Sequence, residues 1–185
     1  MPTATERLFF AVRPDALTAQ RIEALVQALR REYGFRGKSL GPERFHVTLH
    51  LIGTFTGSIP ASVVSRAVEA ARPVAANASA FHVGFDTVAS FTRKRRNMPL
   101  VLLGGDGVLS IARLQQTLLA ALTSASLASH PEAGFTPHLT LLYDDIPLAP
   151  LPIDALIWRV DELLLIRSLV GLGRHEVLER FPLGT

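Results

Sequence analysis

Phe45-His46-Val47-Thr48-Leu49 is a short apolar stretch whose pattern His-x-Thr-Leu returns 92 residues later as His138-Leu139-Thr140-Leu141. The chain has 13 Thr and 29 Leu in 185 residues, so a given His has about a 1% chance of being followed by this pattern. Two copies are therefore unlikely to arise by chance and indicate a duplicated element.

Both copies lie in runs rich in Val, Leu, Thr, Ile and Tyr, which favour β-strands. Residues two apart on a strand face the same side, so each motif presents its imidazole and its hydroxyl together. The apolar residues in between should face the core. They are Val47, Leu49, Leu139 and Leu141.

The sequence before each motif is repeated as well. Leu8 precedes His46 by 38 residues, and Leu100 precedes His138 by 38. Each interval begins with a strand-like run and continues with apolar residues at helical spacing, which predicts two copies of strand, helix and motif strand. We therefore expect an α+β fold with two pseudo-two-fold-related lobes, each an antiparallel sheet with flanking helices, and an active-site cleft between them.

The whole chain, residues 1–185, is expected to form one domain of two intertwined lobes, with repeat halves at about 7–92 and 99–183. Helix signals predict a helix capped by Asp15 and closed by Gly34, and a second from Pro60 that stops at Pro73. Other expected features are strands at Leu8–Val12, Phe81–Phe91 and Leu100–Leu103, a hairpin tip at Arg93–Asn97, a helix carrying Ile111 to Leu122, and final strands at Ile157–Ile166 and Glu176–Phe181.

Composition limits the possible chemistry. Hydrophobic residues make up 48% of the chain and charged residues 19%, as in a globular protein, and neither a secretory segment nor a membrane span is evident, so the cytoplasm is the expected location. The lack of Cys excludes disulfides, thiolate nucleophiles and Cys-bound zinc. The net charge is only +3, but the cluster Arg93-Lys94-Arg95-Arg96 suggests a local site for anions.

Two histidines and two hydroxyls in a cleft can carry out phosphoryl chemistry by acid–base catalysis. One neutral imidazole can accept a proton from the nucleophile while the other, protonated, donates to the leaving oxygen. A metal site is the alternative, but His46 and His50 are four residues apart, roughly 13 Å along a strand at about 3.3 Å per residue, too far to share one ion. The remaining histidines are read as structural or exposed: His50, His82, His130 and His175.

The chain resembles the two-histidine (2H) phosphoesterase superfamily, and within it the bacterial RNA 2',3'-cyclic phosphodiesterases, also called 2'-5' RNA ligases (LigT-like proteins). The likeness covers nearly the whole chain. It rests on Arg7-Leu8-Phe9-Phe10-Ala11, His46-Val47-Thr48-Leu49 with Leu51-Ile52-Gly53, Pro137-His138-Leu139-Thr140-Leu141, Ser168-Leu169 and Phe181-Pro182-Leu183.

The resemblance implies metal-independent opening of terminal 2',3'-cyclic phosphates of RNA or nucleotides to 2'-phosphates, with no cofactor. It makes His46 the acid and His138 the base, with Thr48 and Thr140 holding the phosphate. A monomer without obligate protein or membrane partners is expected. Joining RNA ends by the reverse reaction and binding RNA ends without turnover are the alternatives.

One position departs from the family pattern. Relatives often have Arg two residues beyond the second motif, where this chain has Tyr143, which cannot supply a fixed positive fork. Two alternatives follow: either Arg93, Arg95, Arg96, Arg167 or Arg174 supplies the missing charge, or the substrate differs from that of the better-known members. The candidate substrate-contacting residues are Tyr143, Phe135, Phe10, Arg95 and Arg96.

Overall fold

The computed structural model describes residues 5–128 and 134–184. The elements in chain order are β1 (Thr5–Val12), α1 (Ala16–Tyr33), β2 (Val47–Thr56), α2 (Ala61–Asn77), β3 (Phe81–Ser90), β4 (Met98–Leu103), the 3-10 helix η1 (Asp106–Val108), α3 (Leu109–Ser124), β5 (His138–Asp144), β6 (Leu151–Val160), β7 (Glu162–Leu169) and β8 (Arg174–Pro182). The order contains β1–α1–β2 and β4–α3–β5, so the predicted repeat of strand, helix and motif strand is confirmed.

The strands pair antiparallel in the order β6-β3-β4-β5-β2-β1-β7-β8. The two motif strands lie at the centre and divide this order into two groups of four, which we call the β2 half (β2, β1, β7, β8) and the β5 half (β5, β4, β3, β6). A single register pair, Val47 with Leu139, joins the halves. The two expected sheets are thus continuous through one residue pair.

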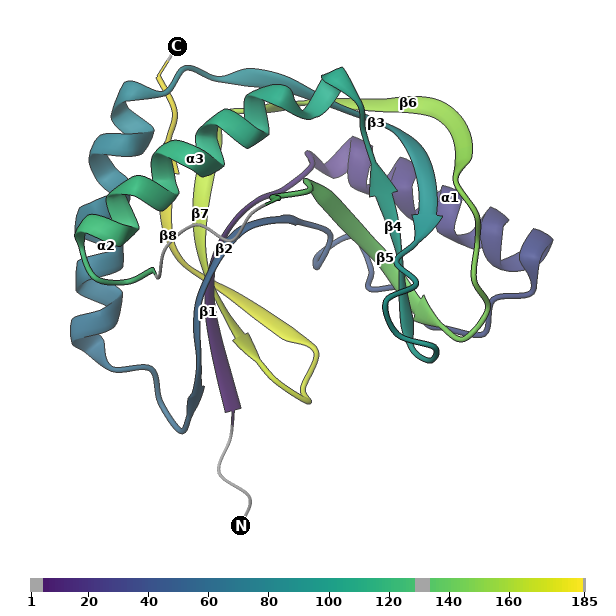
Figure 1. The fold of residues 1–185 in the computed structure, drawn as a ribbon, viewed down its shortest axis with the longest axis horizontal. Helices are drawn as coiled ribbons and strands as arrows, with labels where there is room; N and C mark the ends of the chain where they lie inside the picture. Colours follow the sequence, from purple (N-terminus) through teal and green to yellow (C-terminus); the bar gives the residue numbers. More distant parts are fainter. Residues whose placement is uncertain (1–4, 129–133, 185) are drawn as a thin grey trace.

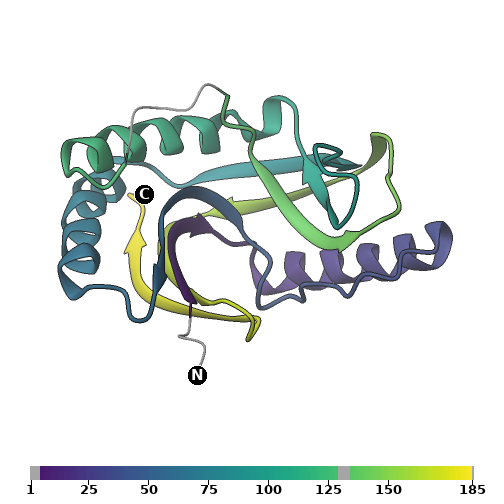
Figure 2. The ribbon, with the colours of Figure 1, turned by 60° about the horizontal axis from the view of Figure 1, so that its bottom comes forward.

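The helices pack against strands of both halves (Figure 1). Although α1 follows β1 of the β2 half, it packs against β5 and β6 of the β5 half. On the other side, α2 contacts β7 and β8, and α3 contacts α2, β2 and β3. Figure 2 shows from another direction that α1 and α2 lie at opposite ends of the molecule, with α3 extending from α2 toward the β5 half.

The ends of α1 form as the sequence predicts. Asp15 caps the first turn, where its Oδ1 accepts a hydrogen bond from the Thr18 backbone N–H at 2.9 Å. Gly34 ends the helix in the left-handed conformation (φ 73°), which glycine adopts without a Cβ clash, and its N–H donates to the Arg30 carbonyl.

The predicted end of α2 at Pro73 is wrong, because the helix continues to Asn77. Proline removes one backbone hydrogen bond from the helix. The turn that follows buries Val74 and Ala75 against the core, and the Asn77 side chain donates to the Pro73 carbonyl at 2.8 Å. These contacts offset the lost bond.

The single strand predicted for Ile157–Ile166 is also wrong. The chain is interrupted at Asp161, with β6 in the β5 half and β7 in the β2 half. β6 already begins at Leu151 and includes Pro152, which an edge strand tolerates because one side of it lacks a pairing partner. The final strand lies within β8, and Arg93–Asn97 lies between the paired strands β3 and β4, so both of these predictions are confirmed.

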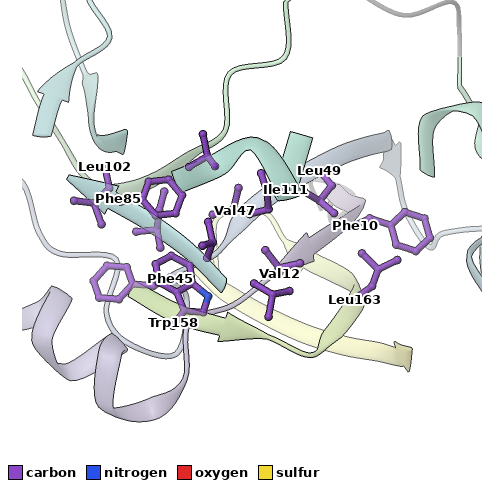
Figure 3. Packing of buried hydrophobic residues seen from close by; sticks show 14 of the residues in the cluster. Phe10, Val12, Phe45, Val47, Leu49, Phe85, Leu102, Ile111, Trp158 and Leu163 are labelled. Carbon is purple, nitrogen blue, oxygen red and sulfur yellow. The ribbon is translucent and has the colours of Figure 1, made fainter. Parts of the chain in front are cut away.

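The main core lies on one face of the strands and runs through both halves (Figure 3). The four apolar motif residues Val47, Leu49, Leu139 and Leu141 are all buried there, as predicted. In β1, Phe10 and Val12 join this core, whereas Phe9 and Ala11 form a small separate cluster with residues of β7. The alternation leaves the imidazoles and hydroxyls of the motifs on the face opposite the main core.

Candidate functional site

The two motifs meet at the junction of the halves. Val47 pairs with Leu139 in an antiparallel register. Continuing that register by one residue in each direction places His46 opposite Thr140 and Thr48 opposite His138. Directly opposed residues have Cβ atoms about 4.5–5.5 Å apart, so the junction gathers two imidazoles and two hydroxyls on one face.

Both imidazoles are held by the same local hydrogen bond. Nδ1 of His46 lies 2.7 Å from the carbonyl oxygen of Arg44, and Nδ1 of His138 lies 2.9 Å from that of Thr136. A carbonyl oxygen only accepts, so Nδ1 carries the hydrogen in both rings. Nε2 is therefore the nitrogen left available for proton transfer in each.

The surroundings of the two imidazoles differ. The ring of His46 packs against Phe9 and His175, with centroid distances of 5.1 and 5.2 Å. Burial, the largest cause, together with the positive charges of Arg13, Arg44 and His138 lowers its pKa to about 4, against the opposing effect of the Arg44 carbonyl. His46 is therefore neutral in the free protein at neutral pH.

His138 faces a wide groove between the halves. The groove has a volume of about 1090 Å³ and extends from the junction toward α3. Phe91 packs edge-on against the ring of His138 with a centroid distance of 5.0 Å. The residues that line the groove include Thr48, His50, Ile52, Ser90, Phe91, Arg93, Gln115, Leu119, Phe135, Thr136 and His138. A groove of this size accommodates a nucleotide-sized ligand.

Some of the residues predicted to contact the substrate line the groove, and others do not. Phe135 lines the groove, as does Arg93 from the basic cluster. Phe10 is fully buried and packs against Phe181, so the stacking role expected for it is wrong. Its neighbour Phe9, one position earlier and on the opposite face of β1, is the aromatic residue beside His46.

Tyr143 lies on the same face as Thr140. Their partners on β4 are Pro99 and Val101, which are two residues apart, so a bulge in between preserves the facing. The ring is 43% exposed and does not line the groove. Arg95 and Arg96 are exposed at the β3–β4 hairpin and also lie outside the groove lining.

Two arginines expected to replace the missing charge are paired with carboxylates. Arg167 donates to Glu176 through Nε at 3.0 Å and through Nη2, and lies 3.9 Å from Glu6. Arg174 lies 3.3 Å from Glu176. These carboxylates offset the charge of both side chains, and neither arginine lines the groove, so a phosphate contact of Arg167 or Arg174 stays a prediction.

Sequence reasoning missed three residues beside His46: Arg13, Arg44 and His175. Charge on each arginine lowers the pKa of both His46 and His175. The only signal in the sequence was proximity: Arg44 lies two residues before His46, and Arg13 directly follows the apolar run of β1. His175, read as structural or exposed, contacts the ring of His46.

The other histidines play smaller parts. His50 lines the groove, and burial lowers its pKa while the Leu127 carbonyl raises it. His82 is exposed on β3. His130 lies outside the described residues.

Within residues 5–128 and 134–184, no three His, Asp or Glu side chains gather as a metal site requires. None of the helices described for this chain is long and apolar enough to cross a membrane.

The paired motifs on an antiparallel α+β scaffold define a two-histidine phosphoesterase fold. The chain belongs to the 2'-5' RNA ligase superfamily, whose family model matches residues 14–171. Comparison with curated protein sequences gave no match.

Solved structures share the fold over nearly the full length of the chain. Escherichia coli LigT in its apo form superimposes with a TM-score of 0.77 at 21% identity, covering 98% of this chain and 99% of that protein. The Thermus thermophilus protein TT0787 gives a TM-score of 0.74 at 23% identity, with coverage of 96% and 97%. Usb1 of Kluyveromyces marxianus is more distant, with a TM-score of 0.54 at 13% identity and coverage of 98% and 99%.

Proposed function

We propose that this protein is a metal-independent phosphodiesterase that opens 2',3'-cyclic phosphate ends of RNA or nucleotides to 2'-phosphates. One observation carries the proposal: Val47 of the first motif pairs with Leu139 of the second. Continued by one residue in each direction, this register would put each motif histidine opposite the threonine of the other motif. A phosphate over the junction would meet an imidazole and a hydroxyl from each strand.

The chemistry needs one proton acceptor and one proton donor. Nε2 of His138 takes a proton from water, and the water oxygen forms a bond to phosphorus. The bond between phosphorus and the 3' oxygen breaks, and His46 gives its proton to that oxygen. The hydroxyls of Thr48 and Thr140 donate hydrogen bonds to the non-bridging oxygens as negative charge accumulates.

The surroundings of the rings support this division of roles. His138 lines the open groove, where water has access, and its fixed Nδ1–H leaves Nε2 as an acceptor. His46 lies on the enclosed side, and its pKa of about 4 makes it neutral before substrate binds. Burial is the main cause of this low pKa, so in this proposal His46 takes up the proton that it later donates only when a bound phosphate places negative charge beside it.

Structures of relatives support the class of substrate. E. coli LigT has been solved with 3'-AMP, with ATP, with phosphate and with NADP+. We extend a nucleotide-phosphate ligand to this chain, with the phosphate at the junction and the nucleoside in the groove. There Phe91 and Phe135 offer aromatic surface for a base.

Product analysis with nucleoside 2',3'-cyclic phosphates in the presence of a chelator tests the proposal. Wild type should yield the 2'-phosphate, and His46→Ala and His138→Ala should each reduce turnover by at least about 10²-fold. His82→Ala removes an exposed histidine and serves as the matched control. Full activity of both motif variants would contradict the proposal.

The same residues could join RNA ends through a 2'-5' bond in the reverse reaction, which the description of the matching family favours. Supplying RNA with a 5'-hydroxyl end together with the cyclic phosphate distinguishes the two directions by product length. A protein that binds cyclic phosphates but leaves them intact would instead be an RNA-end binding module.

A further inference from the structure

A cationic cluster lies beside His46 on the enclosed side of the junction. Arg44 precedes His46 by two residues, and Arg13 directly follows the last residue of β1. A Cβ added to Gly173 would lie 3.3 Å from Nη1 of Arg44, which places the guanidinium against the β7–β8 turn. His175 on β8 closes the cluster, because its ring contacts both His46 and Phe9.

The nitrogens of this cluster are buried without hydrogen-bond partners in the described part of the chain. They are Nε and Nη2 of Arg13, Nε of Arg44 and Nδ1 of His175. Buried polar groups in folded proteins are nearly always satisfied, and guanidinium nitrogens require an acceptor. Among residues 5–128 and 134–184, the cluster thus offers donors without acceptors, which a bound anion would supply.

The charge of the cluster is only partly compensated. Burial and the charge of Arg180 lower the pKa of Arg13, and the smaller opposing effects of Glu162 and Glu43 do not reverse this. The Glu162 carboxylate forms its ion pair with Arg180. Arg167 and Arg174, in contrast, have carboxylate partners within 4 Å. An anion from solution would satisfy both the hydrogen bonds and the charge that the described residues leave unmatched at the two arginines beside His46.

The position of the cluster indicates which anion it binds. Arg44 lies in the turn just before β2, two residues from His46, and the groove lining begins at Thr48 of β2 and continues to Ile52. A ligand whose nucleoside fills the groove thus places its phosphate over His46 and Thr48, next to Arg44. The planar guanidinium fork matches phosphate oxygens.

We infer that Arg13 and Arg44 form a phosphate subsite beside His46, which supplies the positive charge that Tyr143 does not. The inference rests on the proposed function for the identity of the ligand as the reacting phosphate. The two guanidiniums donate hydrogen bonds to the non-bridging oxygens, and Thr48 and Thr140 contact the same group. No bond is made or broken by either arginine.

Calorimetric titration with inorganic phosphate tests the subsite without any turnover. Arg13→Gln and Arg44→Gln should each raise the Kd for phosphate by about tenfold or more, because each removes charge-assisted hydrogen bonds. Arg159→Gln on the exposed side of β6 makes the same change of charge away from the site and should leave the Kd within about twofold. An unchanged Kd in both site variants would overturn the inference.

Two further measurements separate a binding role from a structural one. Removing an unpaired buried cation relieves repulsion, so the Tm of Arg13→Gln without phosphate should equal or exceed that of wild type. The pKa of His46, followed by NMR, should rise in the same variant because a positive neighbour is lost. A lower Tm with unchanged phosphate affinity would identify Arg13 as a structural residue and overturn its role.

The outcomes distinguish the subsite from the reaction. If wild type leaves cyclic phosphates intact but binds phosphate through both arginines, the proposed function fails and the subsite stands. If turnover is normal and both variants bind phosphate as wild type does, the function stands and the subsite fails.

Discussion

The His46 and His138 sides of the junction share a motif, a strand position and a backbone hydrogen bond, but not an environment. His46 is enclosed by Phe9, His175 and two arginines, whereas His138 opens onto the groove. Local sequence fixes the available nitrogen in both rings, and tertiary packing makes the rings different. Duplication of the motif thus gives two similar imidazoles, and we propose that their different surroundings assign them different roles.

The largest effect is expected from removing the imidazoles. His46→Ala and His138→Ala should each lower turnover of a 2',3'-cyclic nucleotide by about 10²–10⁴-fold. Because the two groups act in one step, the double variant should lose little more than either single variant. Rate measurements on all three check this. Losses that simply multiply would show that the rings act independently.

Removing the hydroxyl of Thr48 or Thr140 should lower kcat/KM less than removing an imidazole, and the two losses should be similar. Thr48→Val and Thr140→Val keep the side-chain shape but remove a donor to a charged oxygen, a bond worth about 1.5–3 kcal/mol. We expect kcat/KM to fall by about 10- to 100-fold in each. A loss confined to one variant would mean that the phosphate is not held symmetrically across the junction.

Proton uptake on binding separates the two imidazoles directly. The pKa of His46 is about 4 in the free protein, so a bound anion that raises it makes the protein gain a proton. Phosphate should therefore bind more tightly as the pH falls from 7 toward 5. Calorimetry in buffers with different ionisation enthalpies measures the uptake, which should be lost in His46→Gln. Uptake that persists in that variant would assign the proton to another group.

The same low pKa values predict how stability depends on pH. His46 and His175 both have pKa values near 4 in the folded protein, below the value of about 6.5 expected when unfolded. The unfolded chain therefore binds more protons between these values, and the free energy of unfolding should fall as the pH drops from about 6.5 to 4. Denaturant unfolding measures this, and added phosphate should reduce the loss. A flat profile would contradict the burial of these rings.

The smallest effect is expected at the hairpin. Arg95 and Arg96 are exposed and outside the groove lining, so replacing both with Gln should weaken RNA binding modestly and reduce its salt dependence, without affecting turnover of a cyclic nucleotide. Two lost phosphate contacts on a single strand reduce the slope of log K against log salt by about 1.4. Binding measured at several salt concentrations checks this. An unchanged slope would show that the hairpin does not contact RNA.

The order of strands and helices was readable from the sequence because each element carries a clear periodicity and its own end signals. The two errors in the fold arose where tertiary packing prevails over local signals. The core contacts of Val74 and Ala75 carry α2 past Pro73, and the turn at Asp161 sends an apolar run into both halves. Neither effect is visible within a short window of sequence.

The sequence indicates the two motif histidines more clearly than the residues that surround them. A repeated motif locates His46 and His138, and the period of two on a strand gives their shared face. The sequence predicts Phe10 at the site, but the structure places Phe9 beside His46. In a continuous run of apolar residues, the sequence does not show which side chains face the core. The roles of Arg13 and Arg44 depend on the absence of a nearby carboxylate partner among the described residues, which only the packing of distant strands shows.

The most direct test of the account is hydrolysis of a 2',3'-cyclic nucleotide in 18O-labelled water with a chelator present, followed by 31P NMR. Attack of activated water on phosphorus and departure of the 3' oxygen predict a 2'-phosphate that carries one 18O atom. Neither His46→Ala nor His138→Ala should form this product at more than about one hundredth of the wild-type rate. A 3'-phosphate product, an unlabelled product, or labelled 2'-phosphate formed at the wild-type rate by both variants would contradict the account.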